Sequence, residues 1–155
     1  MSNTSVSQDV CWYLSGYADG EGSFCISFSP RNKLRTKIEI RPSFSVSQNS
    51  DRSEVLKLFQ QVLDCGTIRP DRSDKTLKYE VRSLSDLIER VIPFFERYLL
   101  KSSKKHDFVL FSQVCNILKK RNLNKTDLED IIQLATRMNI SGKRKYDKQK
   151  LLSML

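Results

Sequence analysis

The sequence contains a single histidine, His106, and its four cysteines form no C-x-x-C pair. Zinc sites usually need several closely spaced Cys or His ligands, so the cysteines are expected to be buried thiols in a reducing compartment. The histidine lies in a lysine-rich stretch with no nucleophile signature around it. This context argues against a hydrolase of the Ser–His or Cys–His kind.

Long apolar runs and low-complexity tracts are also lacking. No hydrophobic stretch approaches the roughly 20 residues that span a bilayer, so no membrane partner is expected. The first ten residues contain no Lys or Arg, which fits neither a secretory signal nor a transit peptide. With 155 residues, 39% of them hydrophobic, and only 5 Gly and 4 Pro, the chain is expected to form one folded intracellular domain over residues 1–155, with a basic segment at 141–155.

Acidic residues are outnumbered by basic ones, 18 against 27, which gives a formal net charge of +9. Such a surplus favours a polyanionic partner, because each phosphate that a Lys or Arg neutralises releases counterions. The alternative is a basic surface that is simply solvated. Charge alone does not decide between the two.

Hydrophobic periodicity predicts an α+β fold. Helical spacing in residues 8–19 gives way to two alternating hairpins, 23–29 with 34–47 and 67–71 with 76–82. A helix is expected after each hairpin, near Ser53 and Leu84, and Pro93 should break or kink the second. Further helices are expected at 108–118 and 128–138. The order is αββαββα with extra C-terminal helices, an antiparallel sheet, helices on one face and a polar, basic opposite face.

The polar side of the first hairpin carries five basic residues and one acid. They are Arg31, Lys33, Arg35, Lys37 and Arg41, with Glu39 among them. Because a sheet face in contact with solvent usually mixes charges of both signs, this surface is expected to contact DNA or RNA.

The segment from Leu14 to Phe24 reads Leu-Ser-Gly-Tyr-Ala-Asp-Gly-Glu-Gly-Ser-Phe. It places two acids, Asp19 and Glu21, at the negative end of a helix dipole, which is locally unfavourable. A divalent cation such as Mg²⁺ would reverse that cost, since it prefers hard oxygen ligands. In the alternative interpretation Asp19 caps a turn and Glu21 is solvated.

This segment resembles the LAGLIDADG motif of homing endonucleases. Two later blocks resemble the family in the expected order: Phe44-Ser-Val-Ser-Gln48 followed by Arg52, and Ile92-Pro-Phe-Phe95 followed by Leu100 and Lys104-x-x-Asp107-Phe108. The resemblance covers roughly residues 9–114. The motif occurs once, as in the small family members that act as homodimers.

The resemblance implies an active site and a dimer interface. Glu21 is expected to bind a divalent metal together with the carbonyl of Gly20, and Asp19 to cap the helix end. Gln48 is expected to order water and Arg52 to line the pocket, with a lysine from 100–105; Lys101 and Lys104 are both candidates, and Lys104 is preferred. The motif helices of two subunits are expected to pack at the symmetry axis through Cys11, Leu14, Ser15, Ala18 and Gly20.

The resemblance also implies that the polar strand face lies in the major groove of DNA. The residues expected to contact DNA are Ser27, Ser29, Arg31, Asn32, Lys33, Arg35, Lys37, Glu39, Arg41, Ser43, Ser45, Arg69, Asp71, Arg72, Lys78, Glu80, Arg82 and Lys143.

The expected function is therefore site-specific cleavage of a long, pseudo-palindromic double-stranded DNA by a homodimer. One phosphodiester is expected to be hydrolysed on each strand, which gives a staggered break. Mg²⁺ is the expected cofactor, with Mn²⁺ as a substitute and Ca²⁺ supporting binding without cleavage.

The alternatives are a maturase that binds its own intron RNA and a DNA-binding regulator without catalysis. An unpaired Glu21 near phosphates would weaken a pure binder, which argues against the regulator. The expected compartment is a chloroplast or mitochondrial matrix, or a prokaryotic cytoplasm.

Overall fold

The computed structural model describes residues 5–71 and 75–155 of the chain. The elements are α1 (Gln8–Glu21), β1 (Gly22–Pro30), β2 (Ile38–Asn49), a 3₁₀ turn (Ser50–Arg52), α2 (Glu54–Leu63), β3 (Thr67–Pro70), β4 (Thr76–Val81), α3 (Leu84–Asp86), a π-helical turn (Leu87–Val91), α4 (Ile92–Arg97), α5 (Lys104–Leu118), α6 (Lys125–Thr136) and α7 (Lys148–Ser153). The predicted αββαββα order and the extra C-terminal helices are confirmed. Among the described residues, no helix is both long and apolar enough to cross a membrane.

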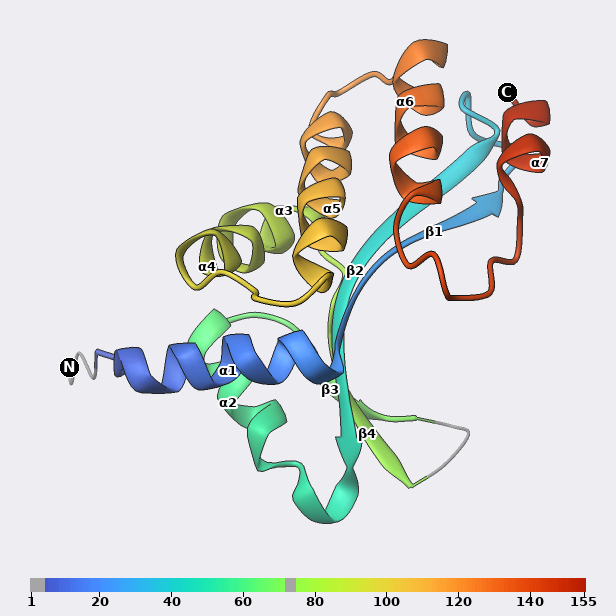
Figure 1. Ribbon diagram of the computed structural model, residues 1–155. Coiled ribbons are helices and arrows are strands. Elements are labelled where there is room, and N and C mark those ends of the chain that lie inside the picture. The colour runs from blue at the N-terminus through green and yellow to red at the C-terminus, as the bar shows by residue number, and fades with distance from the viewer. Residues whose placement is uncertain (1–4, 72–74) are drawn as a thin grey trace.

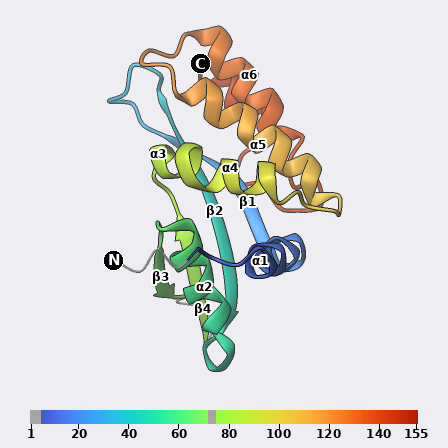
Figure 2. The same cartoon turned by 90° about the vertical axis from the view of Figure 1, so that its left-hand side faces the viewer.

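The strands form one antiparallel sheet in the order β1-β2-β4-β3. The two hairpins meet where β2 pairs with β4, with Phe44 opposite Val81. Helices α1 to α5 lie on one side of the curved sheet, and the other side is open apart from the C-terminal segment that carries α7 (Figure 1). In the view turned by 90°, α1 is seen almost end-on in front of the sheet (Figure 2). The predicted layering is therefore confirmed.

A cluster of phenylalanines forms the core between the sheet and the helices. The ring of Phe24 lies 5.0 Å from that of Phe44, 5.4 Å from Phe95 and 5.3 Å from Phe111. All four side chains are buried. Aromatic pairs at these separations add about 0.5–1.5 kcal/mol each beyond the burial of their surface. The cluster therefore fixes β1 and β2 against α4 and α5.

A tight junction joins α1 to β1. The N–H of Gly22 donates to the carbonyl of Ala18 and ends the helix. A Cβ at position 22 would lie 2.7 Å from that carbonyl oxygen, which is closer than real Cβ contacts allow. Glycine is therefore required here, and Glu21 is the last residue of the helix, directly before the first strand.

The connection between β1 and β2 is longer than predicted. Residues 31–37 form a bonded loop in which Arg31 N–H donates to Lys37 O and Leu34 N–H to Arg31 O. Lys37 adopts a left-handed conformation with φ of 62°, which ends any strand alternation there. Leu34 is 41% exposed rather than on the apolar strand face, so the predicted strand over 34–37 is wrong.

Pro93 does not break its helix. The helical segment continues from Leu84 to Arg97 and passes through the π-helical turn immediately before the proline. A π turn changes the local hydrogen-bond register, which accommodates a residue that has no N–H to donate.

Candidate active site and nucleic-acid interface

The C-terminal end of α1 separates the two acids of the motif. Asp19 accepts hydrogen bonds from the backbone N–H groups of Lys101 (3.1 Å) and Ser102 (2.9 Å), and from the Ser102 hydroxyl (2.5 Å). Burial alone would raise the pKa of Asp19, but these hydrogen bonds outweigh it and lower the pKa. Asp19 thus anchors the segment before α5 and does not cap its own helix, which corrects that expectation. Glu21 is the exposed carboxylate of the pair.

The two candidate lysines lie in different surroundings. Lys104 Nζ donates to the carbonyl of Ala18 at 3.1 Å. Burial lowers the pKa of Lys104, and the nearby charges of Asp19 and Glu21 offset only part of that effect. Lys101 Nζ lies over the ring of Trp12, 5.5 Å from its centroid. The structure therefore brings the ammonium group of Lys104 to the end of α1 and places that of Lys101 beside the helix.

Gln48 reaches the motif helix through Tyr17. At the end of β2, its Oε1 accepts from the N–H of Asn49 at 2.8 Å and its Nε2 donates to the Tyr17 hydroxyl. Burial raises the pKa of Tyr17, the bond from Gln48 lowers it in part, and the charge of Glu21 raises it again. Arg52 is exposed in the 3₁₀ turn that follows β2. Tyr17 is absent from the predicted site although it lies within the motif, four residues before Glu21.

The ligands that one chain could offer to a metal ion at the end of α1 are few. In residues 5–71 and 75–155, no group of three or more His, Cys, Asp or Glu side chains could hold an ion. The exposed carboxylate of Glu21 and the carbonyl of Gly20 are hard oxygen donors at the negative end of a helix, which suits Mg²⁺. Two donors are too few for octahedral Mg²⁺, so phosphates, water or a second chain would have to supply the remaining ligands.

The face of α1 that was expected to form a dimer interface is buried within the chain itself. Cys11 is 6% exposed, Leu14 and Ala18 are 0% exposed, and Ser15 is 2% exposed. The Ser15 hydroxyl donates to the carbonyl of Tyr98 at 2.7 Å. The prediction that these four side chains contact a partner is wrong, because the chain's own helices cover them.

The opposite face of α1 is open. Tyr13 is 54% and Trp12 45% exposed, and both belong to the large hydrophobic side chains that the core leaves uncovered. A Cβ at Gly16 or Gly20 would meet nothing within 4 Å. Tyr13, Gly16 and Gly20 are spaced three and four residues apart, so they lie in one stripe along the same face of the helix. Gly20 is the one predicted interface residue that lies on this open face.

The polar face of the first hairpin is held by its own contacts. Arg31 and Arg41 both bind Glu39, at 2.9 and 3.4 Å, and Arg41 donates to the Ser29 hydroxyl at 3.1 Å. The hydroxyl of Ser27 donates to the backbone of Arg41. All these residues are exposed or half-buried, so the face presents cations and hydroxyl groups to solvent.

The remaining predicted DNA contacts differ in accessibility. Asn32, Lys33 and Lys37 are exposed in the 31–37 loop, whereas Arg35 donates to the carbonyl of Leu123 at 3.2 Å. Several others lie on or beside the strands and are exposed or half-buried: Ser43, Arg69, Asp71, Lys78 and Arg82. Ser45 is only 9% exposed, so its side chain contributes little to the surface. Arg72 lies outside the described residues.

Glu80 is not a surface acid. It is 6% exposed and lies between Arg69 (3.0 Å), Arg82 (3.1 Å) and Lys78 (3.7 Å). Burial alone would raise the pKa of Glu80, but the bond from Arg69 and the charges of Lys78 and Arg82 outweigh it and lower the pKa. The prediction that Glu80 contacts DNA is corrected on this ground, because its carboxylate is already occupied in holding three cations.

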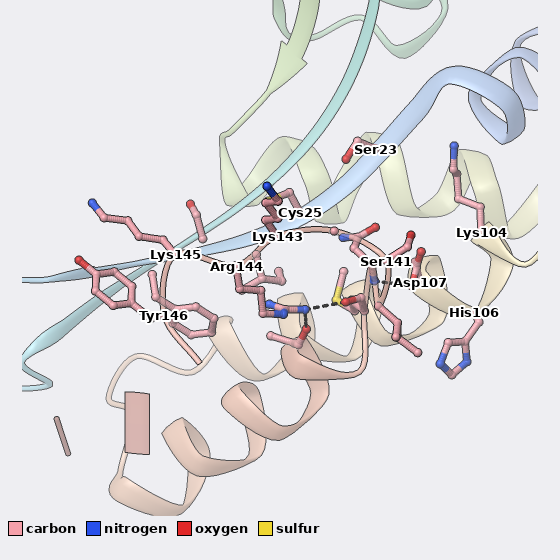
Figure 3. Close-up of a pocket in the computed structure, with 18 of the residues that line it drawn as sticks. Ser23, Cys25, Lys104, His106, Asp107, Ser141, Lys143, Arg144, Lys145 and Tyr146 are labelled. Carbon is pink, nitrogen blue, oxygen red and sulfur yellow. Dashed lines mark hydrogen bonds between the residues drawn. The ribbon is translucent and has the colours of Figure 1, made fainter. Parts of the chain in front are cut away.

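A groove follows β1 on the side where the chain returns after α6 (Figure 3). Its volume is about 1220 Å³; Lys104 lies at one end, Lys145 at the other, and Lys143 between them. Both C-terminal lysines are exposed. Lys145 is absent from the predicted DNA contacts, although the basic run of which it is part carries the same signal as Lys143.

Two side chains fold the loop that carries these lysines. Arg144 donates to the carbonyls of Ala135 and Met138, which end α6, so this arginine caps a helix. Asn139, with φ of 48°, donates to the backbone of Phe24 in β1 at 2.8 Å and bonds Asp107 through its own N–H at 3.0 Å. The basic loop is thereby fixed against the first strand.

Comparison with known proteins places this site in a family. The model of the LAGLIDADG endonuclease family matches residues 14–115. Probable intron-encoded endonuclease 2 of Neurospora crassa is 32% identical over 123 residues, which are 79% of this chain and 26% of that protein. The crystal structure of the I-LtrWI LAGLIDADG homing endonuclease bound to target DNA is similar with a TM-score of 0.83 and 31% identity, over 89% of this chain and 47% of that one.

An archaeal intron-encoded homing endonuclease complexed with DNA, I-Vdi141I, is similar over 96% of both chains, with a TM-score of 0.86 and 27% identity. The chain therefore spans about a quarter of the fungal relative and half of I-LtrWI, but nearly all of I-Vdi141I. The family match includes Glu21, Gln48, Arg52 and both candidate lysines. Its extent, together with the geometry at the end of α1, shows that the chain belongs to the LAGLIDADG endonuclease family.

Proposed function

We propose that the chain is a site-specific homing endonuclease that cleaves double-stranded DNA as a homodimer. The observation that carries the proposal is the exposed carboxylate of Glu21 at the junction between α1 and a sheet whose open face is basic. The chain is similar along nearly its whole length to I-Vdi141I, whose structure was solved with DNA, and this similarity supports DNA as the substrate. The compartment of action is then the one that holds the target DNA.

The open stripe on α1 supports a dimer of two identical chains. Gly16 and Gly20 leave room for a second helix at close approach, and Tyr13 and Trp12 offer apolar surface beside them. The I-LtrWI chain is about twice as long as the part of it that this chain matches, which agrees with a complete enzyme needing two such units. A twofold axis at the stripe would bring two Glu21 carboxylates together and extend the sheet face over a pseudo-palindromic target.

Cleavage requires a cation where the two carboxylates meet, and Mg²⁺ suits the oxygen donors of Glu21 and Gly20, with Mn²⁺ as a substitute. When bound, such an ion activates water and stabilises charge on the leaving oxygen. Gln48 orients the attacking water, while Arg52 and a lysine, Lys104 by its position, offset the charge of the phosphate. The water oxygen bonds to phosphorus and loses a proton to solvent as the bond to the 3′-oxygen breaks, and the 3′-oxygen takes up a proton from solvent. One such event on each strand gives a staggered break.

The proposal is tested by a cleavage selection. Purified protein is incubated with a library of partly randomised palindromic duplexes and Mg²⁺, and the cut ends are sequenced to report the target, the stagger and the symmetry. The matched control is Glu21→Gln, which keeps the size of the side chain but removes its charge, with Ca²⁺ present in a parallel binding assay. We expect one family of palindrome-like sites that the parent cuts and the variant only binds.

Other outcomes would overturn the proposal and identify the alternative. Selective binding of duplexes without cutting by the parent would indicate a DNA-binding regulator. Binding that is salt-sensitive but neither selective nor followed by cutting would indicate an RNA partner, such as the intron from which the chain is translated.

A further inference from the structure

Both ends of the Gln48 amide are held. Its oxygen accepts from the backbone N–H of Asn49 at 2.8 Å, and its nitrogen donates to the Tyr17 hydroxyl. The first bond settles the orientation of the amide, because only its oxygen can accept from an N–H. The nitrogen must then face Tyr17, and one of its two N–H groups remains for a further acceptor.

The ring and the hydroxyl of Tyr17 do separate things. The ring packs 6.3 Å from Phe59 and 6.2 Å from Tyr13, contacts that phenylalanine could also make. The hydroxyl bonds Gln48, which comes from a strand 31 residues further along the chain. Since the hydroxyl accepts from Gln48, its own proton is available to a water molecule or another acceptor.

We propose that Tyr17 is a positioning residue for the cleavage reaction. Its hydroxyl, one helical turn before Glu21, holds the Gln48 amide so that the remaining N–H group is presented to the attacking water. Gln48 without this bond would rotate about its side-chain torsions and lose the fixed direction that preorganised donors need. The inference rests on the proposed function, because it concerns the water used in cleavage.

The test combines Tyr17→Phe, Gln48→Ala and the double variant with a matched control, Tyr79→Phe. Tyr79 is buried, and its hydroxyl donates to the carbonyl of Cys65 at 2.9 Å, so the control also removes one hydroxyl bond but does so in the core. Single-turnover cleavage rates are measured at saturating protein, with DNA dissociation constants in Ca²⁺. The side-chain amide resonances of Gln48 are recorded by NMR on the protein without metal or DNA.

We expect Tyr17→Phe to slow cleavage about tenfold and to change the DNA dissociation constant by less than about twofold. In the Gln48→Ala background the same change should have no further effect, since Tyr17 acts through Gln48. The Gln48 amide resonances should move toward those of a solvated glutamine in Tyr17→Phe. Tyr79→Phe should lower the melting temperature and leave both the rate and the resonances as in the parent.

A parental cleavage rate in Tyr17→Phe would overturn the proposal, as would an equal slowing in both backgrounds or unchanged Gln48 resonances. A parent that cuts no duplex would overturn the proposed function itself and the positioning role with it. The two failures are therefore distinguished by the parent alone.

Discussion

At the scale of single residues, the most constrained charge on the sheet is Glu80. Its carboxylate is buried beneath three cations, while Glu39, on the same face, is exposed to solvent with Arg31 and Arg41. A buried acid among cations fixes their positions, and an exposed acid contributes little because water screens the pair. The two glutamates thus differ in role although both alternate with basic residues in the sequence.

Replacing Glu80 by Gln is expected to lower the free energy of unfolding at pH 7 by about 1–2 kcal/mol, because three cations lose a shared partner. The depressed pKa of Glu80 means that its contribution is present above the unfolded value of about 4.3 and is lost as the pH falls through the folded value. The difference in the free energy of unfolding between parent and variant should therefore become smaller in acid. Urea unfolding at pH 7 and at about pH 3 measures this difference.

The exposed Glu39→Gln variant is the control for Glu80 and should change stability by less than about 0.5 kcal/mol. Equal effects of the two substitutions, or a difference for Glu80 that does not change with pH, would contradict the interpretation.

A second prediction at this scale separates the two lysines. Lys104→Met keeps the aliphatic stem but removes the charge at Ala18 O, and we expect cleavage to slow about a hundredfold with DNA affinity changed less than about threefold. Lys101→Met loses only a contact with the exposed ring of Trp12 and should retain at least about a third of the parental rate. Single-turnover kinetics on both variants decide the assignment, and the reverse ranking would transfer the role to Lys101.

At the scale of elements, α1 has two faces with different uses. Cys11, Leu14, Ser15 and Ala18 bind it to the chain's own core, and the stripe from Tyr13 to Gly20 is open. Small residues on a helix permit close approach, but they do not say which neighbour approaches. The sequence contains both stripes, and only the folded chain shows which of them its own helices cover.

Gly16→Leu is expected to break the proposed dimer without harming the fold. A side chain at this position meets open space in one copy and would collide with the helix of a second copy at close approach. Leucine also favours a helix over glycine by roughly 0.5–1 kcal/mol, so the melting temperature of the monomer should not fall. Sedimentation equilibrium at micromolar concentrations should show that the dissociation constant of the dimer rises at least about tenfold.

Asn116→Leu, at an exposed position of α5, is the control for Gly16→Leu and should leave the association constant unchanged. A Gly16→Leu protein that associates like the parent would exclude this face as the interface.

Alternation and helical spacing predict most elements, because each is encoded by neighbours in sequence. The pairing of β1 with β2, the helix after Ser53 and the motif helix all follow from such patterns, whereas the pairing of β2 with β4 does not. Interactions between distant segments are not encoded this way. The bond between Tyr17 and Gln48, the bond between Asp19 and Ser102 and the bond from Asn139 to Phe24 all require knowledge of which elements meet.

At the scale of the whole molecule, the basic surface extends beyond the sheet. The loop that holds Lys143 and Lys145 lies against β1, so its charges continue the line that begins at Lys104 (Figure 3). Exposed basic residues are therefore not confined to the strands of the open face.

DNA binding is expected to weaken steeply with salt, and Lys143→Ala and Lys145→Ala should each reduce the slope of log K against log salt by about one. Fluorescence anisotropy from about 50 to 200 mM salt measures these slopes. Arg144→Ala should behave differently, with a lower melting temperature because the last carbonyls of α6 lose their donor. Slopes that are unchanged in both lysine variants would place the loop outside the footprint on DNA.

The junction at Gly22 has a consequence for how the proposed enzyme could change its target. The backbone contact with Ala18 fixes the angle between α1 and the sheet, and Glu21 is the residue directly before it. In a dimer joined through α1, the spacing of the two cuts is therefore set by main-chain geometry close to the axis, while the strands choose the bases. Substitutions on the strands can therefore give the protein new target sequences in a genome, while the length of the overhang stays the same.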